Sequence, residues 1–224
     1  MSDDFKRIIA DIHDDAKDND DFMIEEETDT FIAVWDNMDD IDRRYTITDT
    51  DALSEEWLSS KIIITPSADK EMPMGRPDIV RWIMNHIPKE NYQTLNKLIF
   101  IYDDEADFDW LYELFNSNEY DYNLLEVHNL PDENQLGINW YEQCCAVVNI
   151  KTIKQTTRSL ITDEIIEDYE YNSAVTYGLL TTIAHEIRHI AQANPYINEN
   201  IPFENDPEED AENFAQDAYY GVFA

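Results

Sequence analysis

The sequence predicts an α+β fold, and three features of the 224-residue chain indicate it. Short apolar segments alternate with helical segments between residues 61 and 128, which favours parallel pairing of strands. A continuous apolar segment at 144–150 is typical of a buried strand. Two helices follow it, one from about 172 to 194 and one from about 207. The chain therefore combines a sheet-forming middle with long helices after it.

The expected elements follow from the hydrophobic period and from the Pro and Gly residues that interrupt it. Ser2 can cap a helix with one apolar face, and the acidic residues 13–30 indicate a loop, as do residues 68–77. We expect an acidic N-terminal segment of helix and strands, 1–60, which could form an appendage, and a main domain, 61–224. The strands are expected at 31–35, 61–65, 98–102, 123–128 and 144–150, and the helices at 77–87, 108–115, 172–194 and from 207.

The chain carries 50 acidic and 15 basic residues, a formal net charge of −35. Phosphate groups would be repelled, so direct nucleic-acid binding is not expected. The acids are unevenly placed, because residues 101–150 contain 12 acidic residues and no Lys or Arg. Such unevenness indicates negative faces that attract a basic protein partner, although the same charge can also serve only to solvate a surface.

The sequence also bears on location. No apolar run reaches the roughly 18 residues of a membrane-spanning helix, and the N-terminus lacks the apolar core of a signal peptide. Cys144 and Cys145 are adjacent, which disfavours a disulfide between them, so both are expected to be reduced residues of a buried strand. We therefore expect a cytoplasmic protein without membrane association, and its oligomeric state stays open.

The segment TIAHEIRHIAQ, residues 182–192, contains the strongest chemical pattern. Helical residues four apart share a face, so His185 and His189 project side by side at the spacing two imidazoles need to bind one metal ion. Glu186 lies beside that face, where its carboxylate can reach a metal-bound water. An uninterrupted apolar stripe predicts that the segment is helical.

A catalytic zinc site usually has a third protein ligand and one open position. Asp206 and Pro207 predict the start of a helix. The buried face of that helix is expected to carry Ala211, Phe214, Ala215 and Ala218. On this phase, Glu208 is the acid of the first turn that is aimed best toward the buried face. Glu212, one turn further on, is placed to accept a hydrogen bond from a ligand histidine.

Two motifs separated by 18 residues resemble those of gluzincin-type zinc metallopeptidases: H-E-x-x-H beginning at His185 and E-x-x-A-x-x-F-A beginning at Glu208. The second motif is similar to the ImmA/IrrE group of peptidases associated with phages and mobile elements, and the resemblance is limited to residues 172–220. It implies a zincin-like fold, in which a small mixed sheet packs on the helix that carries H-E-x-x-H. It also implies that His185, His189 and Glu208 bind Zn²⁺, that Glu186 is the general base, and that the substrate is a DNA-binding repressor.

We therefore expect a zinc-dependent peptidase that hydrolyses a peptide bond in a basic, DNA-binding protein. Zinc lowers the pKa of its bound water toward about 7, and Glu186 would take the proton of that water. Candidates for the oxyanion-stabilising group are Tyr177, Arg188, Tyr219 and His128. Two other functions stay open: an acidic antagonist that mimics DNA and occupies a nucleic-acid-binding protein, and a zincin that binds zinc without catalysis.

Overall fold

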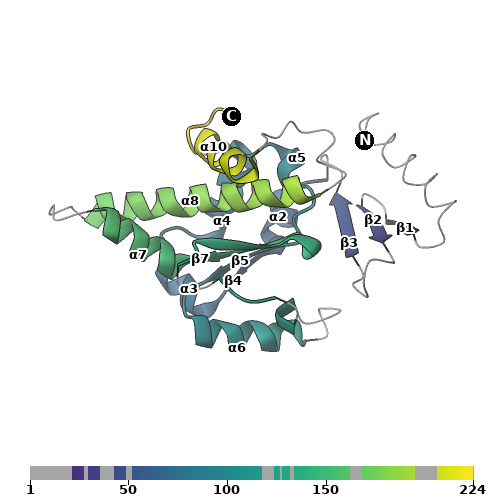
Figure 1. The fold of residues 1–224 in the computed structure, drawn as a ribbon, viewed down its shortest axis with the longest axis horizontal. Helices are drawn as coiled ribbons and strands as arrows, with labels where there is room; N and C mark the ends of the chain where they lie inside the picture. Colours follow the sequence, from purple (N-terminus) through teal and green to yellow (C-terminus); the bar gives the residue numbers. More distant parts are fainter. Residues whose placement is uncertain are drawn as a thin grey trace.

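The computed structural model describes residues 22–27, 30–35, 43–48, 52–117, 124–126, 128–131, 134–161, 168–194 and 206–223. The helix expected after Ser2 lies outside these residues. The described part of the chain combines helices with two sheets, which is the mixed α and β composition that the sequence predicts (Figure 1).

The main sheet has four strands in the order β4-β5-β7-β6. Its strands are β4 (Ile62–Ile64), β5 (Lys97–Ile101), β6 (Gly137–Trp140) and β7 (Cys145–Asn149). Strands β4, β5 and β7 run parallel, and their register aligns Ile63 with Ile99 and Ile99 with Val147. Strand β6 pairs antiparallel with β7 as the neighbouring hairpin strand. The sheet is therefore small and mixed, and the parallel pairing expected from the alternating segments is present.

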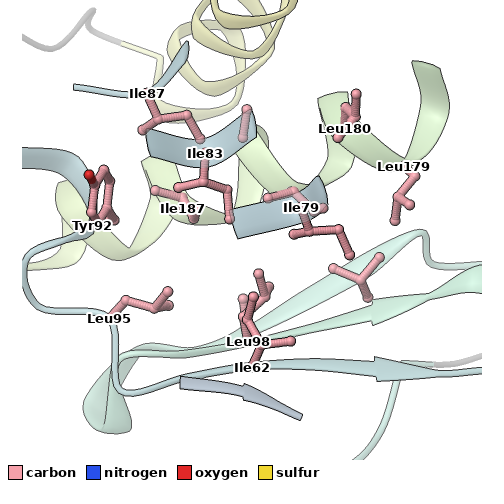
Figure 2. Close-up of a cluster of buried hydrophobic side chains, with 14 of the residues drawn as sticks. Ile62, Ile79, Ile83, Ile87, Tyr92, Leu95, Leu98, Leu179, Leu180 and Ile187 are labelled. Carbon is pink, nitrogen blue, oxygen red and sulfur yellow. The ribbon is translucent and has the colours of Figure 1, made fainter. Parts of the chain in front are cut away.

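The parallel strands of the main sheet are covered on both faces, which explains why they read as continuous apolar segments. Successive residues point to opposite sides of a strand, so Leu98 and Phe100 enter one hydrophobic cluster whereas Ile99 and Ile101 enter another. Figure 2 shows the first cluster, in which Leu98 and its neighbours on the sheet lie beneath side chains of two helices.

Helices cover the two faces of the sheet (Figure 1). Helix α8 (Asp168–Ala193) crosses one face and α10 (Pro207–Tyr219) packs on the outer side of α8, whereas α6 (Asp104–Phe115) covers the opposite face. The helical elements are α2 (Glu55–Lys61), α3 (Pro66–Glu71), α4 (Arg76–His86), α5 (Lys89–Tyr92), α6 (Asp104–Phe115), η1 (Leu124–Glu126), η2 (Tyr141–Gln143), α7 (Ile150–Leu160), α8 (Asp168–Ala193) and α10 (Pro207–Tyr219). The long helices expected from about 172 to 194 and from about 207 are therefore present.

A second, antiparallel sheet has the order β1-β2-β3. Its strands are β1 (Phe22–Glu27), β2 (Thr30–Trp35) and β3 (Arg43–Thr48). Strand β2 matches the strand expected at 31–35. Strand β1, however, falls within the expected loop 13–30, because the acidic composition of that stretch concealed a short apolar segment that pairs with β2. Leu53 and Leu58 belong to the first hydrophobic cluster, so the packed core of the main domain begins before residue 61.

Other local expectations are corrected. The strand expected at 123–128 is replaced by the 3₁₀ helix η1, whose Leu124 and Leu125 are buried in the second cluster. Part of the loop expected at 68–77 belongs to α3, because the hydroxyl of Thr65 accepts a hydrogen bond from the backbone N–H of Ala68 and caps that helix. Among the described helices, none is long and apolar enough to cross a membrane.

Candidate metal centre

Helix α8 positions the two histidines of the H-E-x-x-H motif. Its buried face carries Val175, Leu179, Ile183, Ile187 and Ile190, which are each at most 1% exposed. This stripe fixes the rotation of α8 on the sheet, since turning the helix would expose it. His185 and His189 then fall on the side of α8 that faces α10, with their ring centroids 4.5 Å apart.

Helix α10 brings Glu208 to the same place. The carboxylate of Asp206 caps the helix by accepting hydrogen bonds from the backbone N–H groups of Glu208 (3.0 Å) and Glu209 (3.4 Å). The buried face contains Ala211, Phe214, Ala215 and Ala218, as the helical phase predicts, and also Asp210. Glu208 therefore stands in the first turn, directed toward the histidines of α8.

The three expected ligand atoms converge. Nε2 of His185 and Nε2 of His189 are 2.9 Å apart. The carboxylate of Glu208 lies 3.5 Å from Nε2 of His185 and 3.3 Å from Nε2 of His189. Ligand atoms about 2.0–2.1 Å from a tetrahedral zinc ion are separated by about 3.4 Å, so this spacing fits one ion. Two imidazole nitrogens and one carboxylate oxygen are also a donor set that zinc accepts while keeping an open position.

The electrostatic surroundings keep the His185 imidazole in the form that binds a metal. Burial lowers the pKa of His185, and the neighbouring His189 lowers it further, whereas the negative charges of Glu208 and Glu212 oppose that shift. A neutral imidazole has a lone pair on one ring nitrogen and can coordinate a cation. Burial and the neighbouring His189 thus disfavour protonation of His185 at the point where the ligand atoms meet.

Glu186 is buried between α8 and the edge of the sheet. Its Oε2 accepts a hydrogen bond from the side-chain amide of Asn139 on β6. Gly137, two residues earlier on β6, leaves the room for the carboxylate, because a Cβ there would lie 2.5 Å from Oε1 of Glu186. Burial raises the pKa of Glu186 to about 8; the charge of Glu208 raises it as well, and the hydrogen bond from Asn139 lowers it. A cation beside this carboxylate would favour its ionised form.

A cleft of about 570 Å³ opens beside these groups. It lies between α8, α10 and the start of β6, and its lining includes one histidine and four acidic residues: His185, Glu186, Glu208, Glu209 and Glu212. Among the described residues that line the cleft, none is Lys or Arg. The cleft is therefore negatively charged on the side where the three ligand atoms meet.

Sequence reasoning missed several groups that support the centre. Asn139 and Gly137 lie on β6, a strand too short and too polar to be recognised from periodicity. Tyr141 follows β6, and burial, then the charges of Glu186 and Glu208, raise the pKa of its phenol. A phenol that keeps its proton is a hydrogen-bond donor, and the side chain of Tyr141 is half exposed.

The oxyanion candidates named from sequence are placed differently. Tyr177 lines the cleft and makes an edge contact with Tyr219, with ring centroids 4.7 Å apart. Arg188 is buried in an ion pair with Asp210, in which its Nε lies 2.6 Å from the carboxylate. His128 stacks on Trp140 on the other side of the sheet.

Glu212 was expected to accept a hydrogen bond from one of the two histidines. Among the described residues, no hydrogen bond joins Glu212 to either histidine, and Nδ1 of His189 instead contacts Oε1 of Gln192 at 2.7 Å. Glu212 is exposed on the wall of the cleft, one turn beyond Glu208, and acts on His185 only through its charge.

Comparison of the chain with protein-family models, curated proteins and solved structures gives no match. The function is therefore inferred from the site alone.

Proposed function

We propose that this protein is a zinc-dependent peptidase whose substrate is a basic protein. The observation that carries the proposal is the convergence of His185, His189 and Glu208 from two helices, with the carboxylate of Glu186 in the same cleft. A structural zinc site would be closed by four protein ligands, whereas three described ligands beside a cleft leave a position for water and substrate. Zinc bound there would supply a water of lowered pKa and a Lewis acid for a carbonyl oxygen.

Side chains near the three proposed ligands would supply the remaining steps of hydrolysis. Glu186 would take a proton from the attacking water and return it to the amine that leaves. Asn139 holds one oxygen of Glu186, so the other oxygen is left for proton transfer. Glu186 is buried, so its carboxylate meets solvent only through the cleft that it lines. Tyr141 can donate a hydrogen bond near both carboxylates, which is the type of group that an oxyanion needs.

The preference for a basic substrate is supported by the charge of the cleft. Glu209 and Glu212 lie on the wall of the cleft that α10 forms. The described residues that line the cleft include no Lys or Arg that could pair with these two carboxylates. A cationic segment would be attracted to such a wall, and the attraction would weaken with increasing salt. A DNA-binding protein is one class of substrate with this charge.

The proposal is tested with Glu186→Gln. We expect the variant to bind one zinc per chain, since Glu186 is not a ligand, but to lose cleavage of Arg-rich quenched fluorescent peptides by several orders of magnitude. His185→Ala should lose stoichiometric zinc, which elemental analysis of untagged protein measures. A wild-type chain that binds no zinc, or a Glu186→Gln variant that cleaves as well as wild type, would contradict the proposal.

The alternative of an acidic antagonist is separated in the same assay. Helix α6 exposes Glu105, Asp109 and Glu113 on the face of the sheet opposite the cleft. If the protein acts only by mimicking nucleic acid, replacing these three acids by Gln or Asn would abolish its effect on a basic partner, and Glu186→Gln would leave that effect intact. The peptidase proposal expects the reverse order.

A further inference from the structure

His189 is held from the ring nitrogen that faces away from the other ligand atoms. Its Nδ1 lies 2.7 Å from Oε1 of Gln192. The amide nitrogen of Gln192 donates to the backbone oxygen of Pro207 (2.9 Å) and to Oδ2 of Asp210 (2.8 Å). Both of these atoms can only accept, so the amide nitrogen must face them and Oε1 must face His189. Nδ1 of His189 therefore carries the proton, which leaves the lone pair on Nε2, the atom that lies 3.3 Å from Glu208.

Asp210 is itself anchored in the interface between α8 and α10. It accepts hydrogen bonds from Nε (2.6 Å) and Nη2 (3.0 Å) of Arg188, in the two-pronged geometry that a guanidinium and a carboxylate favour. Nη1 of Arg188 donates to Oδ1 of Asn91 on α5 (2.9 Å), and the guanidinium lies 4.8 Å from the ring centroid of Phe214. Both partners of the ion pair are buried, with 7% and 6% of their side chains exposed.

The Arg188–Asp210 ion pair contributes more to the placement of α10 on α8 than to the stability of the fold. A buried ion pair loses the hydration of two charges, and apolar residues of similar volume often stabilise a fold as well or better. What the pair supplies is a fixed rotation and position of α10 relative to α8. The position of Glu208 depends on the placement of α10, because its side chain is 75% exposed and is not held by packing. Asp210 is two residues further along the same helical turn, so anchoring Asp210 places Glu208.

We infer that Gln192 and Asp210 are positioning residues of the metal centre, which hold the tautomer of His189 and the placement of Glu208 through one hydrogen-bonded network. The inference rests on the proposed zinc site. In this network Arg188 anchors Asp210. Arg188 stands immediately before the second histidine of the motif. The network links the helix that carries two ligands to the helix that carries the third.

The first experiment measures zinc affinity of the full-length chain by competition with a chromophoric chelator. We expect Gln192→Leu to weaken zinc binding about 10–100-fold, the range found when a partner of a ligand histidine is removed. The visible absorption of the Co²⁺-substituted protein should shift as well, since the geometry around the ion changes. Gln155→Leu, at an exposed position of α7, is the matched control and should leave both the affinity and the spectrum unchanged.

The second experiment tests whether the two residues act together. Asp210→Asn removes the charged partner of Arg188 and should also weaken zinc binding, because α10 loses its anchor. If the two residues act through one network, the losses caused by Gln192→Leu and Asp210→Asn should add less than fully in the variant that carries both. Melting of the metal-free variants shows that each one is folded.

The outcomes are distinct. Zinc affinity of Gln192→Leu equal to that of wild type would overturn the inference, and so would losses from Gln192→Leu and Asp210→Asn that add fully in the double variant. A wild-type chain that binds no zinc would overturn the proposed function together with this inference. Failure of the network alone is recognised by tight zinc binding in wild type and in every variant.

Discussion

Replacing Gly137 by alanine should disturb Glu186 without changing any chemical group of the site. A Cβ at position 137 would lie 2.5 Å from Oε1 of Glu186 and 2.9 Å from its Cγ and Cδ, against 3.4–4 Å in ordinary contact. The carboxylate must therefore move by about 1 Å, and an error of that size in a catalytic group can cost about 100-fold in rate. Forcing an extra methyl group into a packed place also costs about 1–3 kcal/mol of unfolding free energy.

The assay is a double-mutant cycle in denaturant unfolding of the metal-free protein. Gly137→Ala should be destabilising in the wild-type background. In a Glu186→Ala background the atoms that would clash are absent. Gly137→Ala should then be neutral, or should stabilise the fold by about 0.4–1 kcal/mol because alanine lowers the conformational entropy of the unfolded chain. The coupling energy between the two positions should then be about 1–3 kcal/mol. Zinc stoichiometry of Gly137→Ala should stay at that of wild type, because none of the three proposed ligands is displaced.

Gly75→Ala is the control, since a Cβ there would meet nothing closer than 3.6 Å. Gly75 is the N-cap of α4, where alanine caps less well than glycine, so a small loss of stability is expected, and this loss should be the same in the wild-type and Glu186→Ala backgrounds. An equal penalty for Gly137→Ala in both backgrounds would show that the close approach of β6 to Glu186 does not set the cost, and the reasoning would be refuted.

Two further predictions concern the charges of the site. Glu208→Gln should weaken zinc affinity far more than Glu209→Gln, because only Glu208 lies beside both histidines; chelator competition measures the difference. In metal-free protein the pKa of Glu186, about 8, lies above its ordinary value of 4.5, so the folded state holds an extra proton between these values and the unfolding free energy falls as pH rises through this window. At about 1.4 kcal/mol per pKa unit the difference from Glu186→Gln reaches at most about 5 kcal/mol.

The pH measurement is best made between about pH 6.5 and 8.5. His185 has a lowered pKa, so its contribution to stability is lost only below its ordinary value of 6.5 and does not enter this range. Parallel stability curves for wild type and Glu186→Gln would contradict the burial of an ionisable Glu186. Equal zinc affinities of the Glu208→Gln and Glu209→Gln variants would contradict the ligand assignment.

Much of the site is predictable because it depends on helical period. The spacing of His185 and His189 and the phase set by Phe214 and its neighbours place three side chains with no knowledge of the sheet. The supporting groups depend on contacts between elements, and a linear pattern does not contain these. Asp210, for example, is one more acid in an acidic first turn, and its burial becomes clear only when Arg188 faces it across the helix interface.

The fold shows the same division. Apart from Lys97 and Asn149 at their ends, the parallel strands β5 and β7 are apolar because both of their faces are covered, so the sequence predicts them. Strand β6 is partly exposed and carries Gly137 and Asn139, which are poor strand formers. Its strand conformation therefore depends on its hydrogen-bonded pairing with β7. Helix α7 was not anticipated either, although Asn149 caps it by accepting a hydrogen bond from the backbone N–H of Thr152.

The division of the proposed ligands between two helices would have consequences for the exchange of a bound metal. His185 and His189 stay together as long as α8 is intact, whereas Glu208 stays with them only while α10 is docked. Loss of the ion would therefore begin with the opening of the α8–α10 interface, and its rate would follow the local stability of that interface. The same interface forms two walls of the cleft, so a ligand that spans α8 and α10 would slow the departure of the ion while it occupies the cleft.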